Sequence, residues 1–138
     1  IAEYQRLHHP VSMEKQEFAG RYALVVEDNE LNQMIIGKIL TEAGFKVDLA
    51  ENGEKGVGLV SRNHYDVVLM DVRMPVMDGL EATRRIRAAN KELPIIALSA
   101  NAYAEDIKKS LDTGMNAHLA KPIDIQKLLG TLHSVIGI

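Results

Sequence analysis

The chain has 138 residues, 46% of them hydrophobic and 25% charged, which is typical of a single globular domain with its own core. A formal net charge of −3 argues against nucleic acid as a direct partner. The absence of cysteine excludes disulfide frameworks, thiolate metal sites and cysteine nucleophiles, and we expect a cytoplasmic protein. Because no apolar run is long enough to cross a bilayer, we expect the domain itself to lie outside the membrane, whether or not a longer parent chain carries an anchor.

The first twenty residues show neither a helical nor a strand period, and they predict a linker or N-terminal extension over residues 1–20. The folded domain is expected over residues 21–138. Since the chain begins at Ile1 rather than Met, we expect it to be part of a longer protein.

Five short apolar runs predict buried β-strands in the second segment. Three of them are strong, at Tyr22–Val26, 67–70 and 95–98, and two are weaker, at 45–49 and Ala117–Ala120. Each strong run is apolar at consecutive positions, which indicates strands that are buried on both faces.

Amphipathic stretches between these runs predict five helices, at 31–43, 54–61, 80–89, Ala104–Thr113 and Ile125–Ile136. Asp28 or Asn29 is expected to cap the first helix, and Asp124 the last. The second helix is the weakest prediction, because Gly56 and Gly58 each cost about 1 kcal/mol relative to Ala inside a helix. The alternation of strands and helices predicts an α/β fold, with a doubly wound parallel sheet covered by helices on both faces.

Charged and polar residues follow the apolar runs at the carboxyl ends of the strands, where a parallel sheet forms its ligand site. The first run is followed by Glu27 and Asp28, the third by Asp71, the fourth by Ser99 and the fifth by Lys121. We therefore expect three carboxylates, a hydroxyl and an ammonium group to meet at one edge of the sheet, although they are far apart in the sequence.

Neighbouring carboxylates repel one another unless a cation balances them. Because the donors are oxygens, with no His or Cys in the set, they favour a hard ion that retains water, and Mg²⁺ fits better than Ca²⁺. Together with Lys121, such a pocket can accept a dianionic phosphoryl group, to which Ser99 can donate a hydrogen bond. Asp71 is the candidate nucleophile, because an Asp carboxylate can take up a phosphoryl group as an acyl phosphate.

Four short motifs resemble one family, the receiver domains of two-component signalling. They are Val-Glu-Asp-Asn at 26–29, Leu-Met-Asp-Val-Arg-Met-Pro-Val-Met-Asp-Gly at 69–79, Ala-Leu-Ser-Ala-Asn-Ala at 97–102 and Ala-Lys-Pro-Ile at 120–123. The resemblance spans residues 21–138 in register, and four motifs at separate strand ends are more specific than any one of them. It implies a five-stranded, flavodoxin-like (β/α)5 fold with strand order 2-1-3-4-5.

The same resemblance implies a phosphoacceptor rather than an enzyme, and a role for each acidic residue. Asp71 would be the phosphoacceptor, supplied by a phosphohistidine of a histidine kinase domain. Asp28 would bind Mg²⁺ directly and Glu27 largely through water. Asp71 itself and the backbone carbonyl of Arg73 would complete the protein ligands.

The family also implies how the phosphoryl group is held and detected. Ser99 and Lys121 would hold its oxygens, and Ser99 would move toward it while an aromatic residue of the fifth strand turns inward. His118 stands where the family usually has Tyr or Phe. We expect this His to make the inward state sensitive to pH, because its reference pKa is about 6.5.

The Asn29-x-x-Asn32 pattern and the turn at 99–102 are most similar to receivers of hybrid sensor histidine kinases, so we expect the C-terminal receiver of such a kinase. A standalone response regulator is the alternative. The phosphoryl group would be hydrolysed or passed to a histidine of a phosphotransfer domain.

The family's output or dimer face maps to residues 104–136 of this chain, which is where a homodimer would be expected. Tyr103, Ile107 and Leu111 fit a partner contact or a core position equally well.

Other functional classes fit the residues less well. An interaction module that keeps the fold without the chemistry would be expected to lose the acceptor, the acidic pair or the Lys, and this chain keeps all three. A phosphohydrolase with an aspartyl nucleophile usually has a second Asp two residues later, where this chain has Arg73. Neither a P-loop nor a Gly-x-Gly-x-x-Gly turn is present to indicate nucleotide binding. Taken singly, Asp28 or Asp78 is better explained as a helix cap, so the functional interpretation depends on convergence.

Overall fold

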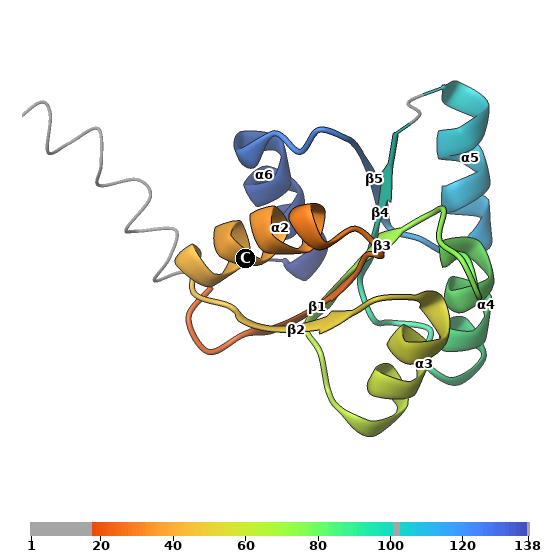
Figure 1. Ribbon diagram of the computed structural model, residues 1–138, viewed down its shortest axis with the longest axis horizontal. Helices are drawn as coiled ribbons and strands as arrows, with labels where there is room; N and C mark the ends of the chain where they lie inside the picture. The colour runs from red at the N-terminus through yellow and green to blue at the C-terminus, as the bar shows by residue number, and fades with distance from the viewer. Residues whose placement is uncertain (1–17, 101–102, 138) are drawn as a thin grey trace, which may run out of the picture.

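The computed structural model describes residues 18–100 and 103–137, which form one parallel sheet with helices on both faces (Figure 1). The strands are β1 (Tyr22–Val26), β2 (Lys46–Ala50), β3 (Val67–Asp71), β4 (Ile95–Ser99) and β5 (Ala117–Ala120). Their order in the sheet is β2-β1-β3-β4-β5. The α/β fold and the strand order expected from the sequence are both confirmed.

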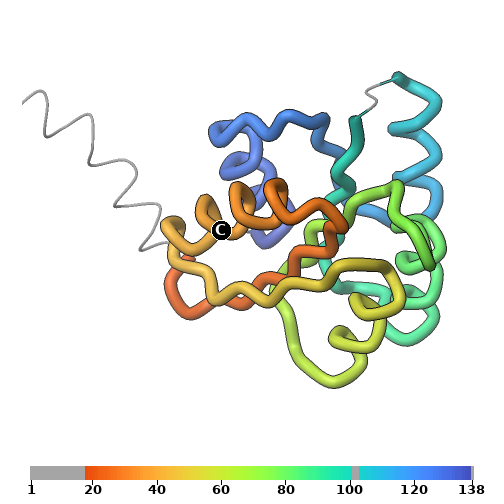
Figure 2. The backbone as a smooth tube through the Cα atoms, in the orientation of Figure 1, coloured from red at the N-terminus to blue at the C-terminus, as the bar shows by residue number. Residues whose placement is uncertain are grey.

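Two layers of helices cover the sheet. The helices are α2 (Glu30–Glu42), α3 (Gly53–Arg62), α4 (Gly79–Ala89), α5 (Ala104–Thr113) and α6 (Ile125–Ile136). Figure 2 shows α2 and α6 on one side of the sheet and α3 and α4 on the other. None of the helices within the described ranges is both long and apolar enough to cross a membrane.

The core is divided by the sheet into two clusters, because successive strand residues point to opposite faces. Val25 and Leu69 pack beneath α2 and α6, whereas Leu24 and Val68 pack beneath α3 and α4. All four side chains are fully buried. This two-sided burial explains why the central strands are apolar at consecutive positions.

The two helix caps expected from the sequence are resolved differently. Asn29, rather than Asp28, caps α2, since its Oδ1 accepts a hydrogen bond of 3.0 Å from the backbone N–H of Asn32. Asp124 caps α6 as expected, accepting from the N–H of Lys127 at 3.1 Å. Because Asn29 serves α2, the carboxylate of Asp28 is not needed to begin this helix.

The predicted weakness of the helix near Gly56 has a structural reason. A Cβ added at Gly56 would lie 2.9 Å from a methyl carbon of Val26, which is closer than real Cβ contacts. Gly56 therefore lets α3 approach β1 at this point, and close packing offsets the conformational cost of glycine. The helix is also longer than the pattern predicted, covering Gly53–Arg62.

Phe18 lies within the range predicted as an extension, yet it is fully buried in the cluster under α2 and α6. Its ring stacks on Phe45 with a centroid separation of 4.8 Å and contacts the ring of His133 at 4.7 Å. Phe18 is therefore part of the packed core, although it precedes the predicted boundary at residue 21. Residues 1–17 of that predicted extension lie outside the described residues.

Candidate functional site

The acidic and basic residues expected to converge do so at the carboxyl ends of β1, β3 and β5. Glu27 and Asp28 directly follow β1, Asp71 ends β3, and Lys121 directly follows β5. The Nζ atom of Lys121 lies 2.6 Å from Oε1 of Glu27 and 3.2 Å from Oδ2 of Asp71. One ammonium group thus bridges two carboxylates from different strands.

Burial makes this arrangement electrostatically unbalanced, since Glu27 is fully buried and Asp71 is 5% exposed. Burial raises the pKa of Asp71 to about 7, and the neighbouring Glu27 adds to the rise while Lys121 opposes it. Burial also acts to raise the pKa of Glu27, but hydrogen bonds with Asp71 and Lys121 outweigh it and leave that pKa below its ordinary value. A single lysine therefore does not allow both carboxylates to ionise fully at neutral pH.

A divalent cation fits the donors that are present. Carboxylate oxygens of Glu27, Asp28 and Asp71 all lie within 4.8 Å of one another. Asp28 is exposed, so an ion held here would keep water on its outer side. Oxygen donors, few protein ligands and retained water are the conditions that suit Mg²⁺.

The loop after β3 is held against Asp71 by main-chain bonds. The backbone N–H of Arg73 donates to Oδ1 of Asp71 at 3.2 Å, and the N–H of Gly79 donates to the carbonyl of Val72 at 2.9 Å. A Cβ at Gly79 would collide with the main-chain carbonyl of Asp71, so this close return of the chain requires glycine. The structure thus places Arg73 beside the acceptor, and its service as a carbonyl ligand stays a prediction.

The same loop contains a strained residue. Val76 has φ of 71°, and the N–H of Met77 donates to the carbonyl of Pro75 at 2.8 Å, which closes a γ-turn around Val76. A β-branched side chain is disfavoured in this left-handed region. Val76 is 75% exposed, so its own side-chain packing does not compensate for the strain.

Ser99 ends β4 and is nearly buried beside the acceptor. A small cavity of about 250 Å³ is lined by Asp71, Arg73, Ser99, Ala100 and Lys121. The structure therefore brings Ser99 to the same cavity as the acceptor and the lysine. Its hydrogen bond to a phosphoryl oxygen stays a prediction.

His118 lies in β5, half-buried, and pairs in register with Ala97 of β4. Its Nε2 atom is buried and has no hydrogen-bond partner among the described residues. Burial lowers the pKa of His118, although Asp106 of α5 acts in the opposite direction. Its role as a switch residue stays a prediction.

Gln33 of α2 makes a contact with the site that its sequence pattern did not indicate. Its side-chain Nε2 donates a hydrogen bond of 2.6 Å to the main-chain carbonyl of Glu27. Spacing gives a signal only in retrospect, because Gln33 lies one helical turn after the cap Asn29 and so faces back toward the end of β1.

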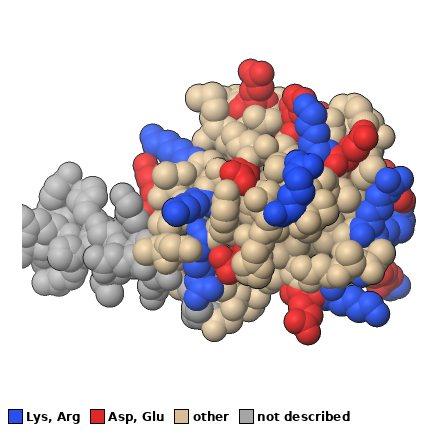
Figure 3. Space-filling model, turned by 90° about the horizontal axis from the view of Figure 1, so that it is seen from below, with Lys and Arg blue, Asp and Glu red and all other residues tan. Residues whose placement is uncertain are grey.

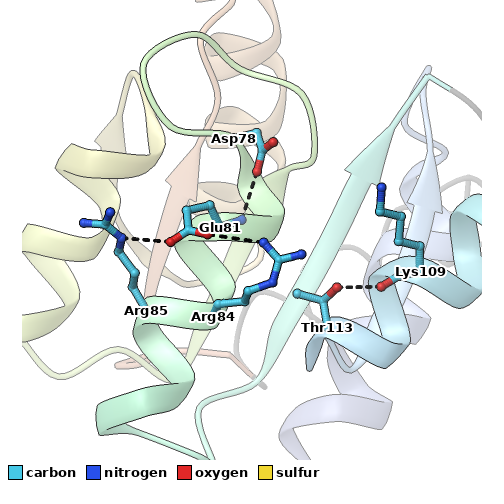
Figure 4. A network of polar contacts seen from close by, with 6 residues as sticks. All are labelled: Asp78, Glu81, Arg84, Arg85, Lys109 and Thr113. Carbon is cyan, nitrogen blue, oxygen red and sulfur yellow. Dashed lines mark hydrogen bonds and ion pairs between the residues drawn. The ribbon is translucent and has the colours of Figure 1, made fainter.

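The basic residues of α4 are occupied with neighbours: Arg84 and Arg85 pair with an acid on their own helix, whereas Arg87 bonds to Gly114 and Asn116. Figure 4 shows Glu81 between Arg84 and Arg85, at 3.2 and 3.1 Å, while Asp78 caps the helix by accepting from the N–H of Glu81. Lys and Arg also alternate with Asp and Glu over the face shown in Figure 3. The face shown in Figure 3 does not present the continuous basic surface that nucleic acid would require.

The surface expected to bind a partner, residues 104–136, has a mixed character. Tyr103 and Leu111 are 69% and 44% exposed, so neither is a core residue, whereas Ile107 is half-buried. These side chains leave apolar area at the surface of α5, and a homodimer through this face stays a prediction.

Comparison with known proteins agrees with this geometry. The sequence model of one protein family, the response regulator receiver domain, matches residues 23–133. This range includes Glu27, Asp28, Asp71, Ser99 and Lys121. This chain belongs to the receiver domain family. The receiver domain of sensor histidine kinase PA1611 from Pseudomonas aeruginosa PAO1 has a TM-score of 0.81 and 44% identity, covering 87% of this chain and 100% of that one. That structure has a magnesium ion coordinated in its active-site cleft.

Other relatives place receiver domains in longer sensor proteins. Sensor protein EvgS of Escherichia coli K12 is 41% identical over 118 residues, covering 83% of this chain but 10% of EvgS. Probable histidine kinase 2 of Oryza sativa subsp. indica is 38% identical, covering 98% of this chain and 15% of that protein. This chain therefore spans only a small part of these curated relatives, and it is a receiver domain of two-component signalling.

Proposed function

We propose that this receiver domain accepts a phosphoryl group on Asp71 from a phosphohistidine of a histidine kinase domain, with the help of Mg²⁺. The observation that carries the proposal is Lys121 bridging Glu27 and Asp71, next to the exposed carboxylate of Asp28. A buried carboxylate cluster of this kind is costly for stability alone, so its presence at the ligand-binding edge of the sheet favours a chemical role.

The transfer is a substitution at phosphorus. A carboxylate oxygen of Asp71 forms the new P–O bond as the P–N bond to the donor imidazole breaks, and the electron pair of that bond returns to the imidazole. Lys121 supports the negative charge on the transferred group, and Ser99 donates a hydrogen bond to it. A bound Mg²⁺ would be held by Glu27, Asp28 and Asp71 with the Arg73 carbonyl, and it would supply charge stabilisation.

We propose that the domain is the receiver of a hybrid sensor histidine kinase, located on the cytoplasmic side, and that its phosphoryl group is hydrolysed or passed to a phosphotransfer-domain histidine. The curated relatives named as sensor proteins and histidine kinases support this context. A receiver domain 30% identical to this chain, with a TM-score of 0.78, has been crystallised with a histidine phosphotransfer protein of Saccharomyces cerevisiae, which supports the partner class. A standalone regulator is the alternative.

The exposed side of α2 is the surface on which we expect the donor to dock. Leu31, Met34 and Ile35 are 63%, 70% and 45% exposed on a helix that begins two residues after Asp28. Exposed apolar side chains grouped on one helix are typical of a protein contact. A donor domain seated there would bring its phosphohistidine to the acidic pocket.

The test is the intact mass of the protein after incubation with Mg²⁺ and acetyl phosphate, beside an EDTA control and Asp71→Asn. We expect one phosphoryl adduct that requires the metal and that the variant lacks. Absence of the adduct, even with a phosphorylated histidine kinase domain as donor, would refute phosphoacceptance and leave a phosphorylation-independent interaction module as the better explanation.

A further inference from the structure

Gln33 forms a bond that links α2 back to the turn carrying the acidic pair. Its side-chain Nε2 donates to the main-chain carbonyl of Glu27 at 2.6 Å. The backbone N–H of Glu27 is held as well, since it donates to the carbonyl of Ala50 at 2.9 Å. Both main-chain polar groups of Glu27 therefore have fixed partners, one from β2 and one from Gln33.

The side-chain hydrogen bond of Gln33 holds the turn that carries Glu27 and Asp28, and it is not one of the bonds that stabilise the start of α2. The N-terminus of α2 is already capped by Asn29, and the backbone N–H of Gln33 donates to the carbonyl of Asn29 at 3.0 Å. The side chain of Gln33 adds nothing to these helical bonds, because its acceptor belongs to the residue that precedes Asp28. Fixing that carbonyl limits the peptide rotation that would turn the side chain of Asp28 away from Asp71.

Loss of the hydrogen bond between Gln33 and Glu27 should be costly, because its acceptor is buried. Glu27 is fully buried, and a buried carbonyl without a donor loses its hydrogen bond to water without compensation. Gln33 lines the same cleft as Asp28 and Glu30, so this side chain lies near Asp28 as well as contacting the carbonyl of Glu27.

We propose that Gln33 is a positioning residue, which sets the affinity of the acidic pocket for its divalent cation by holding Glu27 and Asp28 in place. The inference rests on the proposed metal-assisted function and adds one residue outside the ligand set. It predicts that removing the amide weakens metal binding while leaving the phosphoryl-transfer step intact once the metal is bound.

The test compares Gln33→Met, which keeps the length of the side chain without a donor, with Gln33→Leu, which removes the donor with a shorter side chain and likewise adds no charge. Thr41→Met is the matched control, because it introduces the same apolar side chain at an exposed position of α2 about two turns farther from the site. The dissociation constant of Mg²⁺ is measured by NMR titration without any phosphodonor. The dependence of phosphorylation by acetyl phosphate on Mg²⁺ is measured separately.

We expect both Gln33 variants to bind Mg²⁺ about three- to tenfold more weakly, the effect of losing one buried hydrogen bond. The maximal phosphorylation rate at saturating Mg²⁺ should stay within about twofold of wild type by the same reasoning, and Thr41→Met should match wild type throughout.

Three results would overturn the inference. The first is unchanged Mg²⁺ affinity in Gln33→Met, the second is unchanged or tighter binding in Gln33→Leu, and the third is loss of folding in both variants, which would show a structural role. Failure of the proposed function looks different, because the wild-type protein itself would then take up no phosphoryl group whatever the Gln33 variants do to Mg²⁺ binding.

Discussion

Carboxylates lie in both halves of this sheet, the half near the amino ends of the strands and the half near their carboxyl ends. The two halves differ in the groups that neutralise these carboxylates. In the half near the amino ends of the strands, Oδ2 of Asp48 accepts hydrogen bonds from the phenols of Tyr22 and Tyr65, at 2.9 and 2.6 Å. Asp66 exchanges two bonds with the main chain of Tyr22, both of 2.8 Å. At the carboxyl ends of the strands, Glu27 and Asp71 share Lys121.

The difference shows how a structural carboxylate is distinguished from a reactive one. A hydrogen bond with Asp48 raises the pKa of Tyr22, and burial together with Asp48 raises that of Tyr65, so both phenols stay neutral donors. Neutral donors satisfy a carboxylate without any need for a cation. The pocket around Asp71 has more negative charge than Lys121 balances, and this excess prepares it for a metal ion and a phosphoryl group.

Removing the bridging cation should give the largest effect. Lys121→Met leaves two carboxylates without their partner, and breaking a buried ion pair costs about 3 kcal/mol of unfolding free energy. Urea denaturation in EDTA measures it, with exposed Lys127→Met as the control. Equal, small losses in both variants would show that Lys121 does not balance the pocket.

Removing the charge of the acceptor Asp71 should raise the stability of the metal-free protein, whereas removing Lys121 lowers it. The pKa of Asp71 is raised to about 7, so the wild-type protein loses stability as pH rises from about 4 toward 7. Without metal, Asp71→Asn should be more stable than wild type by about 2 kcal/mol at pH 8, and by less at pH 5. Denaturation at the two pH values checks this, and a gain that does not depend on pH would contradict the charge explanation.

The contrasting half is examined with Tyr65→Phe, which removes one phenol from Asp48 and leaves the other. We expect a loss of about 1 kcal/mol, the usual contribution of one hydrogen bond, with no change in Mg²⁺ affinity. Tyr103→Phe, at an exposed position, controls for the loss of a hydroxyl. A change in Mg²⁺ affinity in Tyr65→Phe would mean that the two halves are coupled.

Relieving the backbone strain at Val76, in the loop after β3, should give a smaller gain in stability. Val76→Asn should raise stability by about 0.5 to 1 kcal/mol, because Asn tolerates the left-handed backbone better than a β-branched residue. Thermal unfolding checks this, with Val135→Asn in α6 expected to lower stability instead. A fall in stability in Val76→Asn would show that Val76 is not strained.

The smallest effect is expected at His118, between the two halves. Since burial lowers its pKa, the folded protein disfavours the charged imidazole, and stability should fall as pH drops below about 6.5. In His118→Phe this part of the pH dependence should disappear. Denaturation between pH 7.5 and 5.5 measures it, and parallel curves for the two proteins would exclude a contribution from His118.

The sequence by itself determined the fold and the ends of its strands. Consecutive apolar residues at 22–26, 67–70 and 95–98 predict strands buried on both faces, and this pattern is a local property of the chain. The polar residues that follow these strands must then lie at one edge of a parallel sheet. For this reason Asp71, Asp28 and Lys121 could be predicted to converge before any coordinates were known.

Only the tertiary structure decided the contacts between side chains that are distant in sequence. The choice of Asn29 over Asp28 as the cap, the stacking of Phe18 on Phe45, and the shared acceptor of Tyr22 and Tyr65 depend on which surfaces meet after folding. Hydrophobic periods identify the face that is buried but not its partner. The same holds for Gln33, whose polar side chain carries no periodic signal and gains its role only where α2 returns to the end of β1.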